Sequence, residues 1–187
     1  KRSQVLGTIT RSSKGLCVAG THGKTTKVQW RRISSTSRMW LHGFFGGISK
    51  NYGTNLLLSP ASPYTVIEAD EFDRSFHWLS PYMSVITSTD PTIWTYTVRA
   101  RLILKLPHYT TLIQPGGALI IRKGLALQPD VQPGVRTYTY SRDEGDFHAE
   151  NIRIGNGEIV IDFIAPDTRI NDIRLGVPIG INIENGV

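Results

Sequence analysis

The spacing of apolar positions changes near residue 121 and predicts two kinds of structure. In the first part, short continuous apolar runs are separated by mixed segments long enough to hold a helix. Such runs are typical of parallel strands that are buried on both faces. The runs are Leu16 to Ala19, Thr65 to Ala69, Met83 to Thr87 and Ala118 to Ile121. We therefore predict an α/β fold, in which a mostly parallel sheet is flanked by helices.

From about Arg136 the apolar positions follow a tighter pattern of short segments joined by turns. Asn156-Gly157 is a strong hairpin signal, because both residues tolerate a positive φ. The expected strands are Arg136 to Tyr140, Phe147 to Ile154, Glu158 to Ile164 and Arg169 to Leu175. We predict that residues 136–177 form a small antiparallel β subdomain.

Two stretches fit neither pattern. Residues 27–45 stand where a connecting helix is expected, yet Ser34 to Ser37 are weak helix formers and no helical period is visible. Residues 92–106 alternate like a strand where another connecting helix is expected. The sequence leaves the structure of both stretches open.

Length and composition are those of one globular domain. The chain has 187 residues, of which 40% are hydrophobic and 19% are charged, so it can bury a core of its own. No run approaches the roughly 20 apolar residues needed to span a bilayer. The single cysteine, Cys17, lies in an apolar run, as a small buried hydrophobe would. Because it cannot form an internal disulfide, we expect a reducing, cytoplasmic setting.

Charge is distributed unevenly along the chain. The net charge is +6, and no Asp or Glu precedes Glu68 although Lys and Arg are frequent there. This asymmetry predicts an anionic partner near the first third, either a nucleic acid or the phosphates of a nucleotide. Nucleic acid is the weaker interpretation, because the basic segment lacks an interleaved aromatic platform and an acidic strand follows it. A solvated basic surface without function is the alternative to both.

A specific motif at residues 20–26 favours the nucleotide. The apolar run to Ala19 leads directly into Gly20-Thr21-His22-Gly23-Lys24-Thr25-Thr26. Glycines let backbone N–H groups approach phosphate oxygens, Lys24 brings a positive charge to the terminal phosphates, and Thr25 offers a hydroxyl to Mg²⁺. We predict that this loop binds nucleotide phosphates and that Lys24 serves catalysis. The alternative is a surface turn that contains Gly-Lys-Thr by chance.

A second candidate lies at Glu68, where an apolar strand ends in acidic residues. Nucleotide-binding domains present a Mg²⁺ ligand in this way, although such acids alone would usually mark the start of a helix. Because side chains alternate along a strand, we predict that Glu68 faces the loop and serves as a metal ligand together with Thr25. The acids that follow are better placed to begin a helix. They are Asp70, Glu71 and Asp73.

Together these motifs resemble the Mur ligases, the family that builds the peptide stem of bacterial peptidoglycan. The resemblance covers nearly the whole chain. It rests on Val18 to Thr26, Gly46 to Asn55, Glu68 to Phe76, Val85 to Asp90, Asp146 to Ile152, and Pro178 with Asn182 and Asn185. It implies that residues 1–187 are the central ATP-binding domain of the family. The chain would then be a piece of a longer protein, without the UDP-binding domain before it and the amino-acid-binding domain after it.

The resemblance also implies an activity in cell-wall synthesis, and hence in cell shape and division. The best-matching branch of the family joins L-alanine to UDP-N-acetylmuramate, with ATP and Mg²⁺ as cofactors, through an acyl phosphate on the muramoyl carboxylate. Thr25 and Glu68 would hold the metal, and Asn182 and Asn185 would lie near the adenine. Because the missing domains would hold the other reactants, we expect no ligation by the isolated chain. No nucleic acid or membrane partner is implied.

Two alternatives remain within this interpretation. The ligase that reattaches recycled murein tripeptide shares the loop, but the sequence around Lys50 to Asn55 and Phe72 to Phe76 is more like the alanine branch. The other alternative is a nucleotide-binding module without catalysis, because the family's histidine is missing after Asp90-Pro91. We expect the nearest histidines, His77 and His108, to be surface or packing residues.

Overall fold

The computed structural model describes residues 2–20, 23–24, 42–44, 48, 53–59, 62–69, 75–88, 106–175 and 180–187. Four residues of the predicted phosphate loop lie outside these ranges, namely Thr21, His22, Thr25 and Thr26. Most of the two stretches that fit neither pattern, residues 27–45 and 92–106, lies outside them as well.

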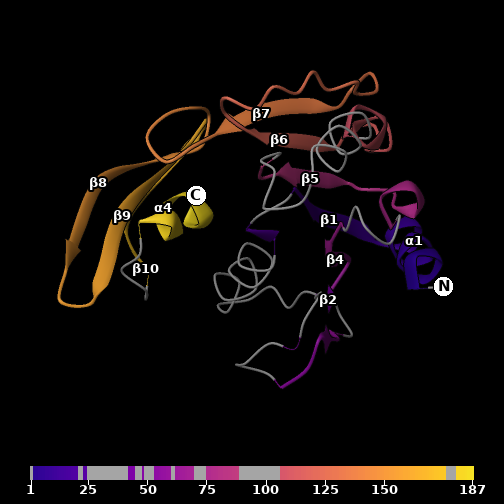
Figure 1. The fold of residues 1–187 in the computed structure, drawn as a ribbon, viewed down its shortest axis with the longest axis horizontal. Coiled ribbons are helices and arrows are strands. Elements are labelled where there is room, and N and C mark those ends of the chain that lie inside the picture. The colour runs from indigo at the N-terminus through magenta and orange to yellow at the C-terminus, as the bar shows by residue number, and fades with distance from the viewer. Residues whose placement is uncertain are drawn as a thin grey trace, which may run out of the picture.

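A seven-stranded sheet forms the centre of the fold, with the order β3-β2-β4-β1-β5-β6-β7. Every neighbouring pair is parallel except β2 and β3. Its strands are β1 (Lys14–Ala19), β2 (His42–Phe44), β3 (Leu56–Leu57), β4 (Tyr64–Glu68), β5 (Met83–Ile86), β6 (Ala118–Arg122) and β7 (Arg136–Tyr140). Figure 1 shows this sheet running from β2 to β7, with β1 near its middle. The predicted α/β fold is confirmed, and all four continuous apolar runs are strands of this sheet.

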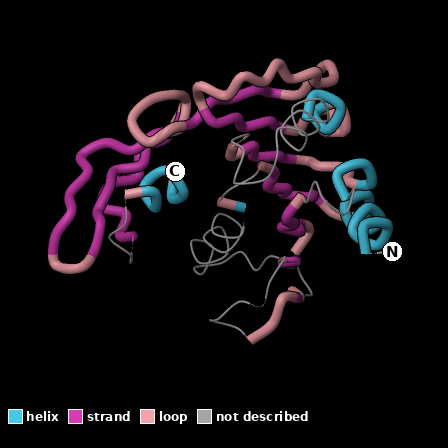
Figure 2. The backbone as a smooth tube through the Cα atoms, viewed as in Figure 1, coloured by secondary structure: helices cyan, strands magenta, loops and turns pink. Residues whose placement is uncertain are grey.

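Both faces of the sheet are covered, which explains why the sequences of its strands are unbroken apolar runs. Along β1, Cys17 and Ala19 pack into one cluster, whereas Leu16 and Val18 pack into another. The first cluster also contains residues of α1 (Arg2–Ser12), of the helix at 106–110 and of the segment after the 3₁₀ helix η1 (Ser75–Trp78). Figure 2 draws α1 and the helix at 106–110 at the same end of the view.

Cys17 lies in this first cluster and is only 1% exposed. Burial raises the pKa of its thiol to about 12, although a hydrogen bond with Tyr109 opposes the shift. The fully buried Tyr109 hydroxyl lies 2.9 Å from the Ser84 hydroxyl on β5. Cys17 is therefore the inert core residue that its position in the sequence predicts.

A three-stranded antiparallel sheet follows, with the order β10-β9-β8. Its strands are β8 (His148–Gly155), β9 (Glu158–Ala165) and β10 (Thr168–Leu175). Asn156 and Gly157 join β8 to β9 with φ values of 51° and 79°, as the predicted hairpin requires. The helix α4 (Ile181–Gly186) lies between this sheet and the large one (Figure 1).

One predicted strand belongs to the other sheet. Arg136 to Tyr140, expected in the antiparallel sheet, is β7, and it pairs parallel with β6 at the edge of the large sheet. Its burial rises from exposed at Arg136 to buried at Tyr140. An edge strand that is partly solvated carries mixed polar and apolar residues, so its sequence resembles that of a half-exposed antiparallel strand.

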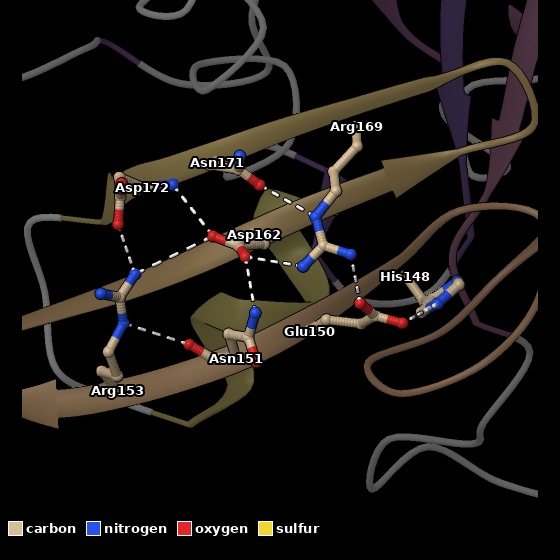
Figure 3. Close-up of polar contacts among 8 residues, drawn as sticks. All are labelled: His148, Glu150, Asn151, Arg153, Asp162, Arg169, Asn171 and Asp172. Atoms are coloured by element: carbon tan, nitrogen blue, oxygen red, sulfur yellow. Dashed lines mark hydrogen bonds and ion pairs between the residues drawn. The ribbon is translucent and has the colours of Figure 1, made fainter.

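The outer face of the small sheet is held together by polar contacts around Asp162 (Figure 3). Asp162, which is 6% exposed, accepts hydrogen bonds from Asn151 Nδ2 at 2.7 Å, from Arg169 at 2.8 Å and from the Asp172 backbone N–H at 3.0 Å. These bonds hold the pKa of Asp162 down at about 2, with the Asn151 bond as the largest cause. Asn151 and Asp172 have positive φ, and each lies where the strand register shifts. Asp162 therefore joins two β-bulges on opposite neighbours of β9.

Among the helices that the structure describes, none combines the length and apolarity that crossing a membrane requires.

Candidate nucleotide-binding site

The predicted phosphate loop begins at the position in the sheet that most favours ligand binding. It follows β1, and the chain places β4 on one side of β1 and β5 on the other. In open α/β sheets, ligands bind at the carboxyl ends of the strands, where the direction of strand addition reverses. Gly20 leaves β1 at that point.

Gly20 has a φ of +126°, which favours glycine. A β-carbon there would collide with the Thr87 hydroxyl oxygen and would lie 2.8 Å from the Ser88 backbone nitrogen. Thr87 itself is fixed on Ala19, whose carbonyl accepts bonds from the Thr87 backbone N–H at 2.9 Å and from its hydroxyl at 3.2 Å. The segment after β5 therefore packs directly on the start of the loop and requires glycine there.

Gly23 and Lys24 are the other described loop residues. Gly23 has a φ of +78°, and a β-carbon on it would lie 3.0 Å from the side-chain oxygen of Asn185. Lys24 is half-buried and helical. Lys24 thus follows the second glycine of the motif in helical conformation, and the first turn of a helix is where backbone N–H groups bind anions.

Glu68 ends β4 beside the loop strand. Its backbone is in register with Val18 of β1, and the next residue, Ala69, donates its N–H to the Val18 carbonyl at 2.9 Å. The Glu68 Oε1 atom is buried and accepts no hydrogen bond from any described residue. A buried carboxylate oxygen without a donor is costly unless a cation or another donor satisfies it. A hard oxygen ligand of this kind fits Mg²⁺.

No group of three His, Cys, Asp or Glu side chains in the described ranges could hold a metal by itself. The predicted partner ligand, Thr25, lies outside those ranges. Among the described residues, Glu68 alone therefore carries the metal prediction.

Two asparagines of α4 complete the site. Asn182 and Asn185 are three residues apart, so they share one face of the helix, and both are half-buried. Ile183, which is fully buried, points away from that face into the small sheet. The proximity of the Asn185 side-chain oxygen to Gly23 places this polar face near the loop.

Not all predicted site residues can be placed. Those that the structure brings to one edge of the sheet are Gly20, Gly23, Lys24, Glu68 and Asn185, with Asn182 on the same helical face. Sequence reasoning missed Thr87, which packs on Gly20, and the ion pair between Arg122 of β6 and Glu184 of α4. No local pattern marks either, because each contact joins residues far apart in the chain. His77 and His108 are exposed, and their rings lie 5.5 Å apart, as expected of surface residues.

Comparison with known proteins finds relatives that are similar over the whole of this chain. The chain is 63% identical over 189 aligned residues to the UDP-N-acetylmuramate–L-alanine ligase of Phocaeicola vulgatus, covering 100% of this chain and 41% of the relative. It is 54% identical to the protein of the same name from Parabacteroides distasonis, again covering 100% of this chain and 41% of that protein. The chain thus spans about two fifths of the length of these relatives. No family model matches it.

Solved structures share the fold at low sequence identity. A MurF ligase from Thermotoga maritima in complex with ADP has a TM-score of 0.73 at 16% identity, covering 99% of this chain and 47% of the other. The ligase for UDP-N-acetylmuramate and L-alanyl-γ-D-glutamyl-meso-diaminopimelate from Neisseria meningitidis has a TM-score of 0.74 at 17% identity, covering 98% and 62%. These likenesses extend over nearly all of the chain, including the small sheet.

Proposed function

Because the chain belongs to the Mur ligase family, we propose that it is the ATP-binding domain of an enzyme that joins L-alanine to UDP-N-acetylmuramate in peptidoglycan synthesis. The relatives that are more than half identical to it carry that name. The tripeptide-recycling ligase shares only the fold at low identity, so it remains the weaker candidate. The protein acts in the cytoplasm, in keeping with its lone buried cysteine.

The observation that carries the nucleotide part of this proposal is the meeting of three features at one sheet edge. The glycine turn leaves the central strand β1, the neighbouring strand carries the Glu68 oxygen that has no hydrogen-bond partner among the described residues, and Asn185 lies close to the turn at Gly23. Each supplies a different need of an ATP site. The turn and Lys24 match the phosphates, Glu68 matches a divalent cation, and the amide groups of α4 match the hydrogen-bonding edge of a base.

The residues have separate roles in this proposal. Lys24 neutralises charge on the terminal phosphates and holds the γ-phosphate in line with its acceptor. Thr25 and Glu68 would hold Mg²⁺, which when bound would neutralise phosphate charge. The residues from Gly20 to Thr26 bind phosphate oxygens through their backbone N–H groups, His22 among them.

The reaction proceeds in two steps on the substrates. An oxygen of the muramoyl carboxylate attacks the γ-phosphorus of ATP, the bond to ADP breaks, and an acyl phosphate forms. The amine of L-alanine then attacks the acyl carbon, phosphate leaves with the bonding pair, and the amine loses a proton. Parts of the protein beyond this chain hold UDP-N-acetylmuramate and L-alanine, since the chain spans only 41% of its relatives.

The test is the affinity of Lys24→Ala for ATP, measured by calorimetry. Charge-assisted hydrogen bonds contribute about 1.5–3 kcal/mol each, so ATP affinity should fall roughly tenfold or more. Lys123→Ala is the matched control, because Lys123 is an exposed lysine that pairs with Glu144 at 2.7 Å. Unchanged ATP binding by a correctly folded Lys24→Ala protein would refute the assignment of residues 20–26 as a phosphate-binding loop. ATP turnover by the protein separates an enzyme from a binding module without catalysis.

A further inference from the structure

The helix α4 is too short to hold its own position. It has six residues, and its N-cap residue, Gly180, gives no side-chain capping bond. A helix of this length is unstable in isolation, so its orientation depends on contacts with the rest of the fold. One such contact is apolar. Ile183 is fully buried against Ile159 and Ile161 of the small sheet, and Leu175 crowds Gly186 at 3.0 Å from the position of a β-carbon.

The second contact is an ion pair with the large sheet. Arg122, the last residue of β6, donates from Nε to the Glu184 carboxylate, and the two side chains are 35% and 14% exposed. Tyr140 lies beside the pair. Burial raises the pKa of the Tyr140 hydroxyl, and the Glu184 carboxylate raises it further. In such a partly buried setting a charge-assisted bond is stronger than the same bond at an open surface.

These two contacts constrain different movements of α4. The apolar anchor fixes the helix on the small sheet, whereas the ion pair fixes it on β6, two strands from the strand that carries the loop. Glu184 is adjacent in sequence to Asn185, whose side-chain oxygen lies close to Gly23 of the loop. Rotation of α4 about its axis would move Glu184 and the asparagine face together, so holding Glu184 also holds that face.

We propose that Arg122 and Glu184 are positioning residues that hold the Asn182–Asn185 face of α4 against the phosphate loop and so set the affinity for the nucleoside part of the nucleotide. This inference rests on the proposed ATP-binding function. Neither residue belongs to the predicted phosphate loop, residues 20–26. Their effect on binding is therefore specific to ligands that carry a base.

The experiment compares a nucleotide with a base-free polyphosphate. The dissociation constants of ADP and of inorganic tripolyphosphate are measured by calorimetry for the unchanged protein, Glu184→Gln, Arg122→Gln and the double variant. For Glu184→Gln the constant for ADP should rise about fivefold, while that for tripolyphosphate stays unchanged. The double variant should lose no more ADP affinity than either single variant, because one interaction is removed in all three. Glu144→Gln is the matched control, since it breaks the exposed pair with Lys123, the neighbour of Arg122.

The outcomes separate this inference from the proposed function. If the unchanged protein binds neither ADP nor tripolyphosphate, both are overturned. If it binds ADP and Glu184→Gln binds equally well, only the positioning role is overturned. An equal loss of ADP and tripolyphosphate binding would also overturn it, because the pair would then support the loop as a whole. Additive losses in the double variant would show that the two residues act separately.

Discussion

Replacing Gly20 with alanine tests how tightly the start of the loop is built into the sheet. Two independent costs follow from the structure. The φ of +126° is one that an L-residue rarely adopts, and the new β-carbon would meet the Thr87 hydroxyl and the Ser88 backbone. The Ser88 nitrogen and oxygen, at 2.8 and 2.9 Å, are backbone atoms that cannot turn aside as a flexible side chain can.

The loss of stability in Gly20→Ala follows from these two costs and from comparison with Gly124, a second glycine at which only one of them applies. Backbone strain of this kind costs about 1–3 kcal/mol, and forcing an extra carbon into a packed site costs about 1–3 kcal/mol more. Gly124 has a φ of +85°, but nothing lies within 4 Å of its β-carbon position. Gly124→Ala should therefore carry only the backbone cost, and Gly20→Ala should be less stable than Gly124→Ala by about 2 kcal/mol.

Thermal and urea unfolding measure this difference directly. For a chain of this size, about 2 kcal/mol corresponds to a midpoint roughly 4–8 °C lower for Gly20→Ala than for Gly124→Ala. ADP affinity should also fall in Gly20→Ala and stay unchanged in Gly124→Ala, because only Gly20 belongs to the predicted phosphate loop. Equal stability of the two variants would refute the inferred packing of Thr87 and Ser88 on the loop.

Two further predictions concern the small sheet and the isolated chain. The pKa of Asp162 in the folded protein is about 2, below its ordinary value of 3.8. The ionised side chain therefore stabilises the fold above about pH 4, and this contribution is lost as the pH falls through 2. The free energy of unfolding of Asp162→Asn, measured with urea, should therefore fall less steeply over that pH range than that of the unchanged protein. Asp167→Asn is the control, because Asp167 lies in the exposed turn between β9 and β10, and its free energy of unfolding should fall as that of the unchanged protein does. The chain of 187 residues, incubated with Mg-ATP, UDP-N-acetylmuramate and L-alanine, should form no amide product, because the proposed function assigns the binding of two of the reactants to parts of the enzyme beyond this chain. Sustained product would mean that the catalytic groups are misassigned.

The large sheet was predictable because its inner strands are buried on both faces. Leu16 to Ala19 and Ala118 to Ile121 show this burial directly in their unbroken apolar sequence. The same reasoning was wrong for Arg136 to Tyr140, where an edge position gives a mixed pattern that does not distinguish parallel from antiparallel pairing. Asn156-Gly157 was predictable for a different reason, since the turn depends on the conformational freedom of the two residues alone.

The candidate site was predictable only where its chemistry is local. Gly20, Gly23 and Lys24 form one continuous motif, and Glu68 ends an apolar strand, so short segments were enough. The ion pair of Arg122 with Glu184 joins residues 62 positions apart, and the bond from Thr87 to Ala19 spans 68 positions. Contacts of that range depend on how the elements pack, and no periodicity or local propensity in one sequence carries that information.

In the small sheet, strand β9 carries an apolar residue on one face and a polar one on the other. Ile161 and Asp162 are neighbours on it, so their side chains point to opposite faces. Ile161 is fully buried with Ile183 of α4, whereas Asp162 holds the bulges of β8 and β10 on the outer face. The polar network thus fixes the shape of the sheet on which α4 rests, and α4 in turn brings Asn185 to Gly23. A small sheet far from the predicted loop in sequence therefore supports the short helix whose Asn185 lies near Gly23.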